Sequence, residues 1–128
     1  MAAKTALIID DNQSNLNVLQ MMLAKNGVQA LGIPSPHQLA AALDDHPPFD
    51  VIFLDLEFPN YSGFELVGQL KARGDLESTP IIAYSVHNSE LREIQDAGFD
   101  GFLGKPLQPH QFADQLARIL RHESVWEF

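Results

Sequence analysis

Short apolar runs of strand length recur along this chain, and several of them end in a charged or hydroxyl side chain. The polar residues in these positions are Asp10, Asp11, Asp55, Ser85 and Lys105. Charged groups beside buried strands are costly to desolvate. In open α/β sheets, however, the carboxyl ends of the strands form the edge where ligands bind. The pattern therefore predicts one acidic pocket that also contains a lysine.

Stretches with helical periodicity separate the apolar runs. We expect strands over 4–10, 28–33, 50–55, 80–85 and 99–104, and helices over 12–26, 36–45, 63–73, 88–97 and from Pro109 to about residue 121. Glycines at positions 27, 74 and 98 favour helix ends. Five successive strand–helix units are typical of the α/β class, with a parallel sheet, right-handed crossovers and helices on both faces.

The composition fits one globular domain. The chain has 128 residues, of which 45% are hydrophobic and 20% are charged. It has no cysteine, which excludes disulfides and thiolate metal sites. The net charge of −9 disfavours direct binding to nucleic acid or to anionic membranes. We find no signal-peptide pattern and no apolar run long enough to span a bilayer, so we expect a cytoplasmic protein.

We expect a single domain over residues 1–128, with a core at about 4–121, a short tail over 122–128 and no output domain. The tail contains Trp126 and Phe128. These rings either pack back on the body of the domain or form a small docking surface, and the first interpretation is favoured.

The predicted pocket holds three carboxylates, from Asp10, Asp11 and Asp55. At ~4 Å and an effective dielectric constant near 20, each pair of like charges costs about 4 kcal/mol. A divalent cation would relieve this repulsion, and Mg²⁺ prefers oxygen ligands of this kind. Protonation of one carboxyl group with a raised pKa is the alternative.

Lys105 and Ser85 add a cation and a hydroxyl donor to the acidic pocket. A lysine ammonium suits a phosphoryl oxygen, and a carboxylate can form an aspartyl phosphate. The combination predicts phosphoryl transfer with Asp55 as the nucleophile, while a cation and Lys105 stabilise the charge on the transferring group.

In these motifs the chain resembles the receiver domains of two-component response regulators, in particular single-domain, chemotaxis-regulator-like ones. The resemblance covers about residues 4–121. Each motif alone is weak, but the ordered set at strand ends is specific. The matching segments are 8–12, 52–56, Pro59, Gly63, 80–85, 97–99 and Lys105-Pro106.

The resemblance implies a flavodoxin-like (βα)5 three-layer sandwich with a parallel five-stranded sheet of order 2-1-3-4-5. It implies that Asp55 is the phosphoacceptor, assisted by Lys105 and Ser85. The implied cofactor is Mg²⁺ (or Mn²⁺), and its predicted ligands are Asp10, Asp11, Asp55 and the backbone carbonyl of Glu57. One of the two acids that follow the first strand is expected to bind through water.

Ser85 and Phe102 match the switch positions of the family, although plain core packing explains Phe102 equally well. Phe102 lacks the hydroxyl of the tyrosine that is common there. The Lys105–Pro106 peptide bond is expected to be cis. On phosphorylation, the surface formed by the fourth helix, the fifth strand and the fifth helix is expected to change.

Three residues around the predicted site depart from the common receiver pattern. Glu57 adds a carboxylate, Val86 is bulkier than the usual small residue, and His87 follows it. We interpret them as tuning residues. Because Glu57 and Val86 would restrict an attacking water, we predict slow loss of the phosphoryl group.

The implied partners are a sensor histidine kinase or a histidine phosphotransfer protein, which would dock near Asp55 through the first helix, and a downstream protein target of unknown identity. The protein is expected to be a monomer or a phosphorylation-promoted dimer. It would catalyse its own phosphorylation and dephosphorylation without being a turnover enzyme.

Three alternatives have less support. A phosphorylation-independent receiver-like adaptor would not need the complete set of Asp55, Ser85 and Lys105. A haloacid-dehalogenase-type phosphatase has a second aspartate two positions after the nucleophile, where this chain has Glu57. A flavodoxin-like cofactor protein has a phosphate-binding loop after the first strand, which this chain lacks.

Overall fold

The computed structural model describes residues 4–46, 48–56, 63–85, 91–105 and 107–127. Strands and helices alternate along this part of the chain, and two 3₁₀ turns, Pro36–Gln38 and Gly74–Leu76, lie between them. The elements are β1 (Lys4–Ile9), α1 (Gln13–Lys25), β2 (Val28–Ile33), α2 (Leu39–Asp44), β3 (Val51–Asp55), α3 (Gly63–Lys71), β4 (Ile81–Ser85), α4 (Leu91–Ala97), β5 (Gly101–Gly104), α5 (Pro109–Leu120) and β6 (Val125–Glu127).

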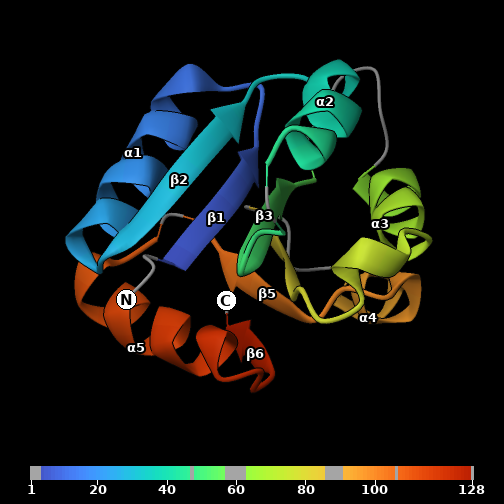
Figure 1. Cartoon of the computed structure of the whole chain (residues 1–128). Helices are drawn as coiled ribbons and strands as arrows, with labels where there is room; N and C mark the ends of the chain where they lie inside the picture. The colour runs from blue at the N-terminus through green and yellow to red at the C-terminus, as the bar shows by residue number, and fades with distance from the viewer. Residues whose placement is uncertain (1–3, 47, 57–62, 86–90, 106, 128) are drawn as a thin grey trace.

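The strands form one parallel sheet of order β2-β1-β3-β4-β5-β6. Helices α1 and α5 cover one face of the sheet, and α2, α3 and α4 cover the other (Figure 1). The α/β class, the flavodoxin-like arrangement and the order of the first five strands are as predicted. The expected helix over 36–45 is divided into a 3₁₀ turn and α2, because Ser35 caps the turn and accepts a hydrogen bond from the His37 amide at 3.2 Å.

The central strand β3 explains how two cores form on one sheet. All five of its residues are buried. Successive side chains of a strand point to opposite faces, so Ile52 and Leu54 pack against α2–α4 while Phe53 packs against α1 and α5. A strand between two helical layers needs apolar residues at every position, which accounts for the continuous apolar run in the sequence.

The prediction of five strands was incomplete, because part of the expected tail forms a sixth. Val125–Glu127 pairs in parallel with β5, and Val125 is buried. A Cβ built on Gly101 would lie 2.6 Å from the Val125 carbonyl oxygen, so the missing side chain lets the two strands approach. Trp126 packs against the core on the α2–α4 face, in agreement with the favoured interpretation of the tail. Phe128 lies outside the described residues.

Glycines end α1 and α4 as predicted. Gly27 and Gly98 adopt positive φ angles of 78° and 104°, a conformation that residues with side chains rarely adopt. Among the described residues, no helix combines the length and the apolar character that crossing a membrane requires.

Candidate functional site

The polar residues predicted to gather at one edge of the sheet come from four strand ends. Asp10 follows β1, Asp55 and Ser85 are the last residues of β3 and β4, and Lys105 follows β5. Asp10, Asp55 and Ser85 are buried although they are polar. Parallel strands in register place their carboxyl ends at the same edge, which brings together residues far apart in the sequence.

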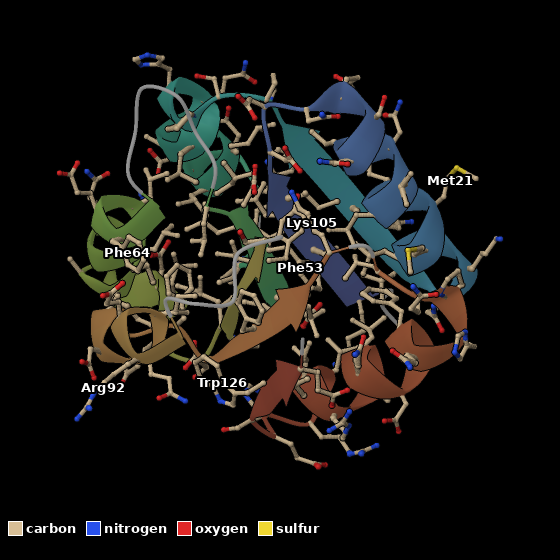
Figure 2. All side chains as sticks on the ribbon, turned by 180° about the vertical axis from the view of Figure 1, so that it is seen from behind. Met21, Phe53, Phe64, Arg92, Lys105 and Trp126 are labelled. Atoms are coloured by element: carbon tan, nitrogen blue, oxygen red, sulfur yellow. The ribbon has the colours of Figure 1, made fainter. Side chains whose placement is uncertain are left out.

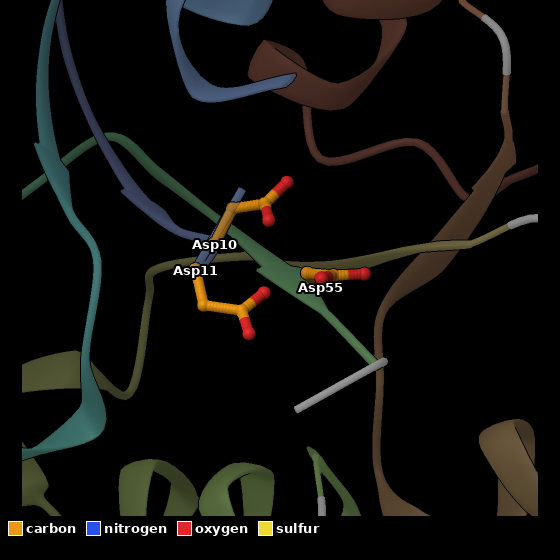
Figure 3. A group of neighbouring side chains, drawn as sticks. All are labelled: Asp10, Asp11 and Asp55. Atoms are coloured by element: carbon orange, nitrogen blue, oxygen red, sulfur yellow. The ribbon is translucent and has the colours of Figure 1, made fainter. Parts of the chain in front are cut away.

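Asp10, Asp11 and Asp55 form an acidic cluster at this edge (Figure 3). One carboxylate oxygen of each lies within 4.8 Å of the others. Asp10 and Asp55 are buried, whereas Asp11 is exposed, so the cluster has a side that solvent reaches. The repulsion expected from the sequence is therefore concentrated on the two buried carboxylates.

Lys105 provides positive charge to both buried carboxylates. Its Nζ lies 3.1 Å from Asp55 Oδ1 and 3.7 Å from Asp10 Oδ2. Its side chain is only 11% exposed. The Lys105 amide donates a hydrogen bond to the Ser85 carbonyl at 2.9 Å, which fixes the end of β5 beside β4. With three carboxylates and one ammonium, the site retains an excess of negative charge.

Tyr84 belongs to the site, although the sequence analysis treated it only as a strand residue. Its hydroxyl donates a buried hydrogen bond to Asp10 Oδ2 at 2.6 Å. Burial, followed by the hydrogen bond to Asp10, raises the pKa of Tyr84 far above its ordinary value of 10, so the phenol remains neutral and can donate. The centroid of its ring lies 4.6 Å from Lys105 Nζ, within the range of a cation–π contact.

The two-residue period of side chains along a strand could have placed Asp10 and Tyr84 on the same face of the sheet. Ile8 and Tyr84 pack on the α1/α5 face of the sheet. Asp10 lies two residues after Ile8, so the same period directs it toward that face. The sequence does not state how far Asp10 lies from a phenol 74 positions away.

Asp10 also accepts a hydrogen bond at its other oxygen. The Asn12 amide donates to Asp10 Oδ1 at 2.9 Å. Asn12 in turn caps α1, because its side chain accepts from the Asn15 amide at 3.0 Å. These two hydrogen bonds connect the end of β1 to the start of α1 through the Asp10 carboxylate and Asn12.

The acidic cluster fits a hard divalent cation. Oxygen ligands on opposite sides of one Mg²⁺ are about 4.2 Å apart, since each Mg–O distance is about 2.1 Å. Carboxylate oxygens spread over up to 4.8 Å are close to this limit. The spread matches a cation that is held directly by some of these carboxylates and through water by another.

Phe102 is fully buried in the core on the α2–α4 face. Its role as a switch residue, like that of Ser85, remains a prediction. Glu57, Val86, His87 and Pro106 lie outside the described residues, and so do the expected cis peptide bond and the expected carbonyl ligand.

Comparison with known families supports a single assignment. The model of the response regulator receiver domain matches residues 6–117, which is most of the chain. The chain is 35% identical over 121 residues to stress response regulator protein 1 of Meyerozyma guilliermondii, covering 90% of this chain and 56% of that protein. It is 34% identical over 110 residues to hybrid signal transduction histidine kinase G of Dictyostelium discoideum, covering 80% of this chain and 3% of the kinase. The chain thus spans only part of the length of these relatives.

Solved structures show the same fold. Chemotaxis response regulator CheY4 of Vibrio cholerae matches with a TM-score of 0.83 and 25% identity, covering 92% of this chain and 99% of that one. The receiver domain of sensor histidine kinase PA1611 from Pseudomonas aeruginosa matches with a TM-score of 0.81 and 22% identity, covering 94% and 99%. That structure has a magnesium ion coordinated in its active site cleft.

Proposed function

The chain belongs to the response regulator receiver domains, and from this membership we propose that Asp55 accepts a phosphoryl group from a phosphohistidine donor. Receiver domains are signalling modules rather than turnover enzymes. The observation that carries the proposal is the position of Asp55, a buried carboxylate 3.1 Å from the Lys105 ammonium and beside two further acids.

The proposed step is a transfer between a nitrogen and an oxygen. An Asp55 carboxylate oxygen attacks phosphorus, a P–O bond forms, and the P–N bond to the donor imidazole breaks. The imidazole nitrogen takes the electron pair and then a proton. Lys105 and Ser85 would contact the phosphoryl oxygens, because Ser85 ends the strand next to that of Asp55 and Lys105 Nζ lies 3.1 Å from Asp55 Oδ1. Later attack of water on phosphorus would release phosphate and restore the carboxylate.

We propose that Asp10, Asp11 and Asp55 hold Mg²⁺ or Mn²⁺, together with the backbone carbonyl of Glu57. When bound, such a cation offsets the negative charge that accumulates on the transferring group. The donor set supports this assignment, since it consists of carboxylate oxygens of which two are buried. The receiver domain of PA1611, which has the same fold, has magnesium in its active site cleft.

Intact-mass measurement after incubation with acetyl phosphate and Mg²⁺ tests the proposal. We expect the mass of one phosphoryl group on the wild-type protein and none on Asp55→Asn. Asp114→Asn is a matched control, because Asp114 is an exposed aspartate on α5, and it should be labelled like wild type. If no donor, including phosphohistidine proteins, labels the wild type, the adaptor interpretation replaces this one.

We propose that the phosphohistidine donor docks on α1. Val18 and Met21 are large apolar side chains of α1 that are 52% and 61% exposed, and Figure 2 shows Met21 pointing away from the body of the domain. Together with Leu107, Pro109 and Ala113 they line one apolar groove beside α5. An exposed apolar helix surface of this kind suits a histidine kinase or histidine phosphotransfer protein, because a protein donor can bury these side chains on docking.

Met21→Glu separates docking from chemistry. Phosphotransfer from a phosphohistidine protein should slow at least tenfold, because a charge would have to be desolvated in the apolar contact. Labelling by acetyl phosphate should not change, because the small donor needs no protein surface. Equal phosphotransfer by both proteins would remove α1 from the docking surface.

The output of the domain also remains part of the proposal. We propose that phosphorylation changes the packing of Ser85 and Phe102, and with it the surface of α4, β5 and α5, to favour a downstream protein. The cytoplasmic location, the stand-alone arrangement and the monomer or phosphorylation-promoted dimer remain predictions. The mass of the protein in native extracts and light scattering with and without phosphorylation would test the last two.

A further inference from the structure

We propose that Tyr84 is a positioning residue of this site, which holds Asp10 with its hydroxyl group and Lys105 with its ring. The inference rests on the proposed function, since it assigns a task to Tyr84 within the proposed cation and phosphoryl site. It concerns a side chain to which neither the family resemblance nor the sequence motifs assigned a role.

The first observation is that Tyr84 touches both charged partners at once. Its hydroxyl is 2.6 Å from Asp10 Oδ2, and its ring lies under Lys105 Nζ with 4.6 Å between Nζ and the centroid. Tyr84 is 1% exposed, so water does not compete for either contact. Phe53 packs edge-on against the ring at a centroid distance of 6.5 Å, whereas the hydroxyl is held by its own hydrogen bond to Asp10.

The second observation is that the two carboxylate oxygens of Asp10 accept hydrogen bonds from different donors. Oδ2 accepts from Tyr84, and Oδ1 accepts from the Asn12 amide. Each carboxylate oxygen has two lone pairs, so these two hydrogen bonds leave the carboxylate capacity for a cation or for a water bound to it. A carboxylate held at both oxygens presents that capacity without first losing rotational freedom. Groups that hold metal ligands in this way typically change metal affinity by about 10–100-fold when they are removed.

The third observation is that the Lys105 ammonium lies between two buried carboxylates. Nζ lies 3.1 Å from Asp55 and 3.7 Å from Asp10, and both are buried. Without the phenol, Asp10 would lose its donor at Oδ2, and a buried carboxylate then draws the nearest cation more strongly. By supplying that donor, Tyr84 leaves the ammonium directed at Asp55, where the phosphoryl group would be received.

Tyr84→Phe removes the hydroxyl and keeps the ring, so it tests the first contact alone. We expect the dissociation constant for Mg²⁺, measured by calorimetry on the unphosphorylated protein, to rise roughly tenfold. The Asn12 amide resonance should also shift in the cation-free protein, because Asp10 relaxes. Labelling by acetyl phosphate should slow at limiting Mg²⁺ and recover when Mg²⁺ is saturating.

Phe53→Leu is the matched control. It removes the ring that packs against Tyr84 but no hydrogen-bond donor, so it should lower stability and leave the Mg²⁺ dissociation constant within twofold of wild type. An equal loss of affinity in both variants would overturn the proposal, since packing alone would then explain it. Unchanged Mg²⁺ affinity in Tyr84→Phe would overturn it as well.

A measurement on the wild type keeps the test independent of how the variants fold. With ¹³C-labelled tyrosine, Mg²⁺ should shift the Tyr84 ring resonance, which Tyr61→Phe assigns because the chain has two tyrosines. A resonance that does not move during the titration contradicts the proposal. None of these binding measurements requires phosphorylation, so failure of Asp55 to be labelled would not be mistaken for failure of this inference.

Discussion

Phe102 of β5 lies directly beside Trp126 of β6 in the register of the sheet. The first is the predicted aromatic switch residue, and the second is the only tryptophan of the chain. Trp126 packs against the same core cluster to which Phe102 belongs, and Figure 2 shows its position near β5 and β6. Trp126 is therefore a fluorescent neighbour whose emission can report a change in the packing of Phe102.

Phosphorylation of Asp55 should change the emission of Trp126. If Phe102 repacks as proposed, the environment of its neighbour on β6 changes with it. The measurement is steady-state fluorescence during addition of acetyl phosphate with Mg²⁺. Asp55→Asn should show no change under the same conditions, and constant emission in a phosphorylated wild type would separate Phe102 from the switch.

Gly101→Ala should displace β6. The new Cβ would meet the Val125 carbonyl oxygen at 2.6 Å and Ile82 Cδ1 at 3.0 Å, so one strand has to move. We expect a loss of about 1–3 kcal/mol in the free energy of unfolding and a red-shifted Trp126 emission. Gly68→Ala is the control, because nothing lies within 4 Å of its Cβ in α3, and it should stabilise by up to about 1 kcal/mol. Equal stability of the two variants would contradict the close approach of β5 and β6.

Acid should weaken the attachment of β6 through Glu127. Hydrogen bonds from Gln115 and then from Arg118 lower the pKa of Glu127 below its ordinary value of 4.5. A carboxyl group with a depressed folded-state pKa contributes stability above its unfolded value, and this contribution is lost as the pH falls through the folded value. Trp126 emission should therefore change below about pH 4.5. Glu127→Gln should remove that part of the pH dependence, while Glu123→Gln, at an exposed pair with Arg121, should retain it.

Asp11→Asn should stabilise the cation-free protein. The exposed carboxylate lies within 4.8 Å of two other acids, and a like-charged pair at about 4 Å in water costs about 1 kcal/mol. Denaturant unfolding should show a gain of this order and a smaller stabilisation by added Mg²⁺, because a ligand of the cation is lost. Asp96→Asn, an exposed position on α4, should change neither quantity. A loss of stability in Asp11→Asn would contradict this prediction, because it would show that favourable contacts of the Asp11 carboxylate outweigh its repulsion by the other two acids.

The lifetime of the phosphorylated form should depend on Glu57 and Val86. Their bulk and charge are predicted from the sequence to restrict the attacking water, so Val86→Ala combined with Glu57→Asn should shorten the half-life. Intact mass followed over time after removal of acetyl phosphate measures it. Equal half-lives in the variant and the wild type would refute this interpretation.

Local patterns in the sequence determined the parallel α/β class, the positions of the first five strands and the edge at which the site lies. The class and the strand positions follow from short apolar runs that are separated by stretches of helical period, and the end of each run sets the edge at which the next residue lies. Asp10, Asp11, Asp55 and Lys105 could therefore be chosen without knowing any distance. The helix ends at Gly27 and Gly98 were also predictable, because their signal is a single glycine that can adopt a positive φ angle.

Only the tertiary structure decided which groups touch. The hydrogen bond from Tyr84 to Asp10 joins residues 74 positions apart, and a period cannot state a distance across strands. Strand β6 is three residues long and has too few positions to show an alternation. It exists because β5 offers a ladder of hydrogen bonds and Gly101 leaves room, and both conditions lie outside the segment itself.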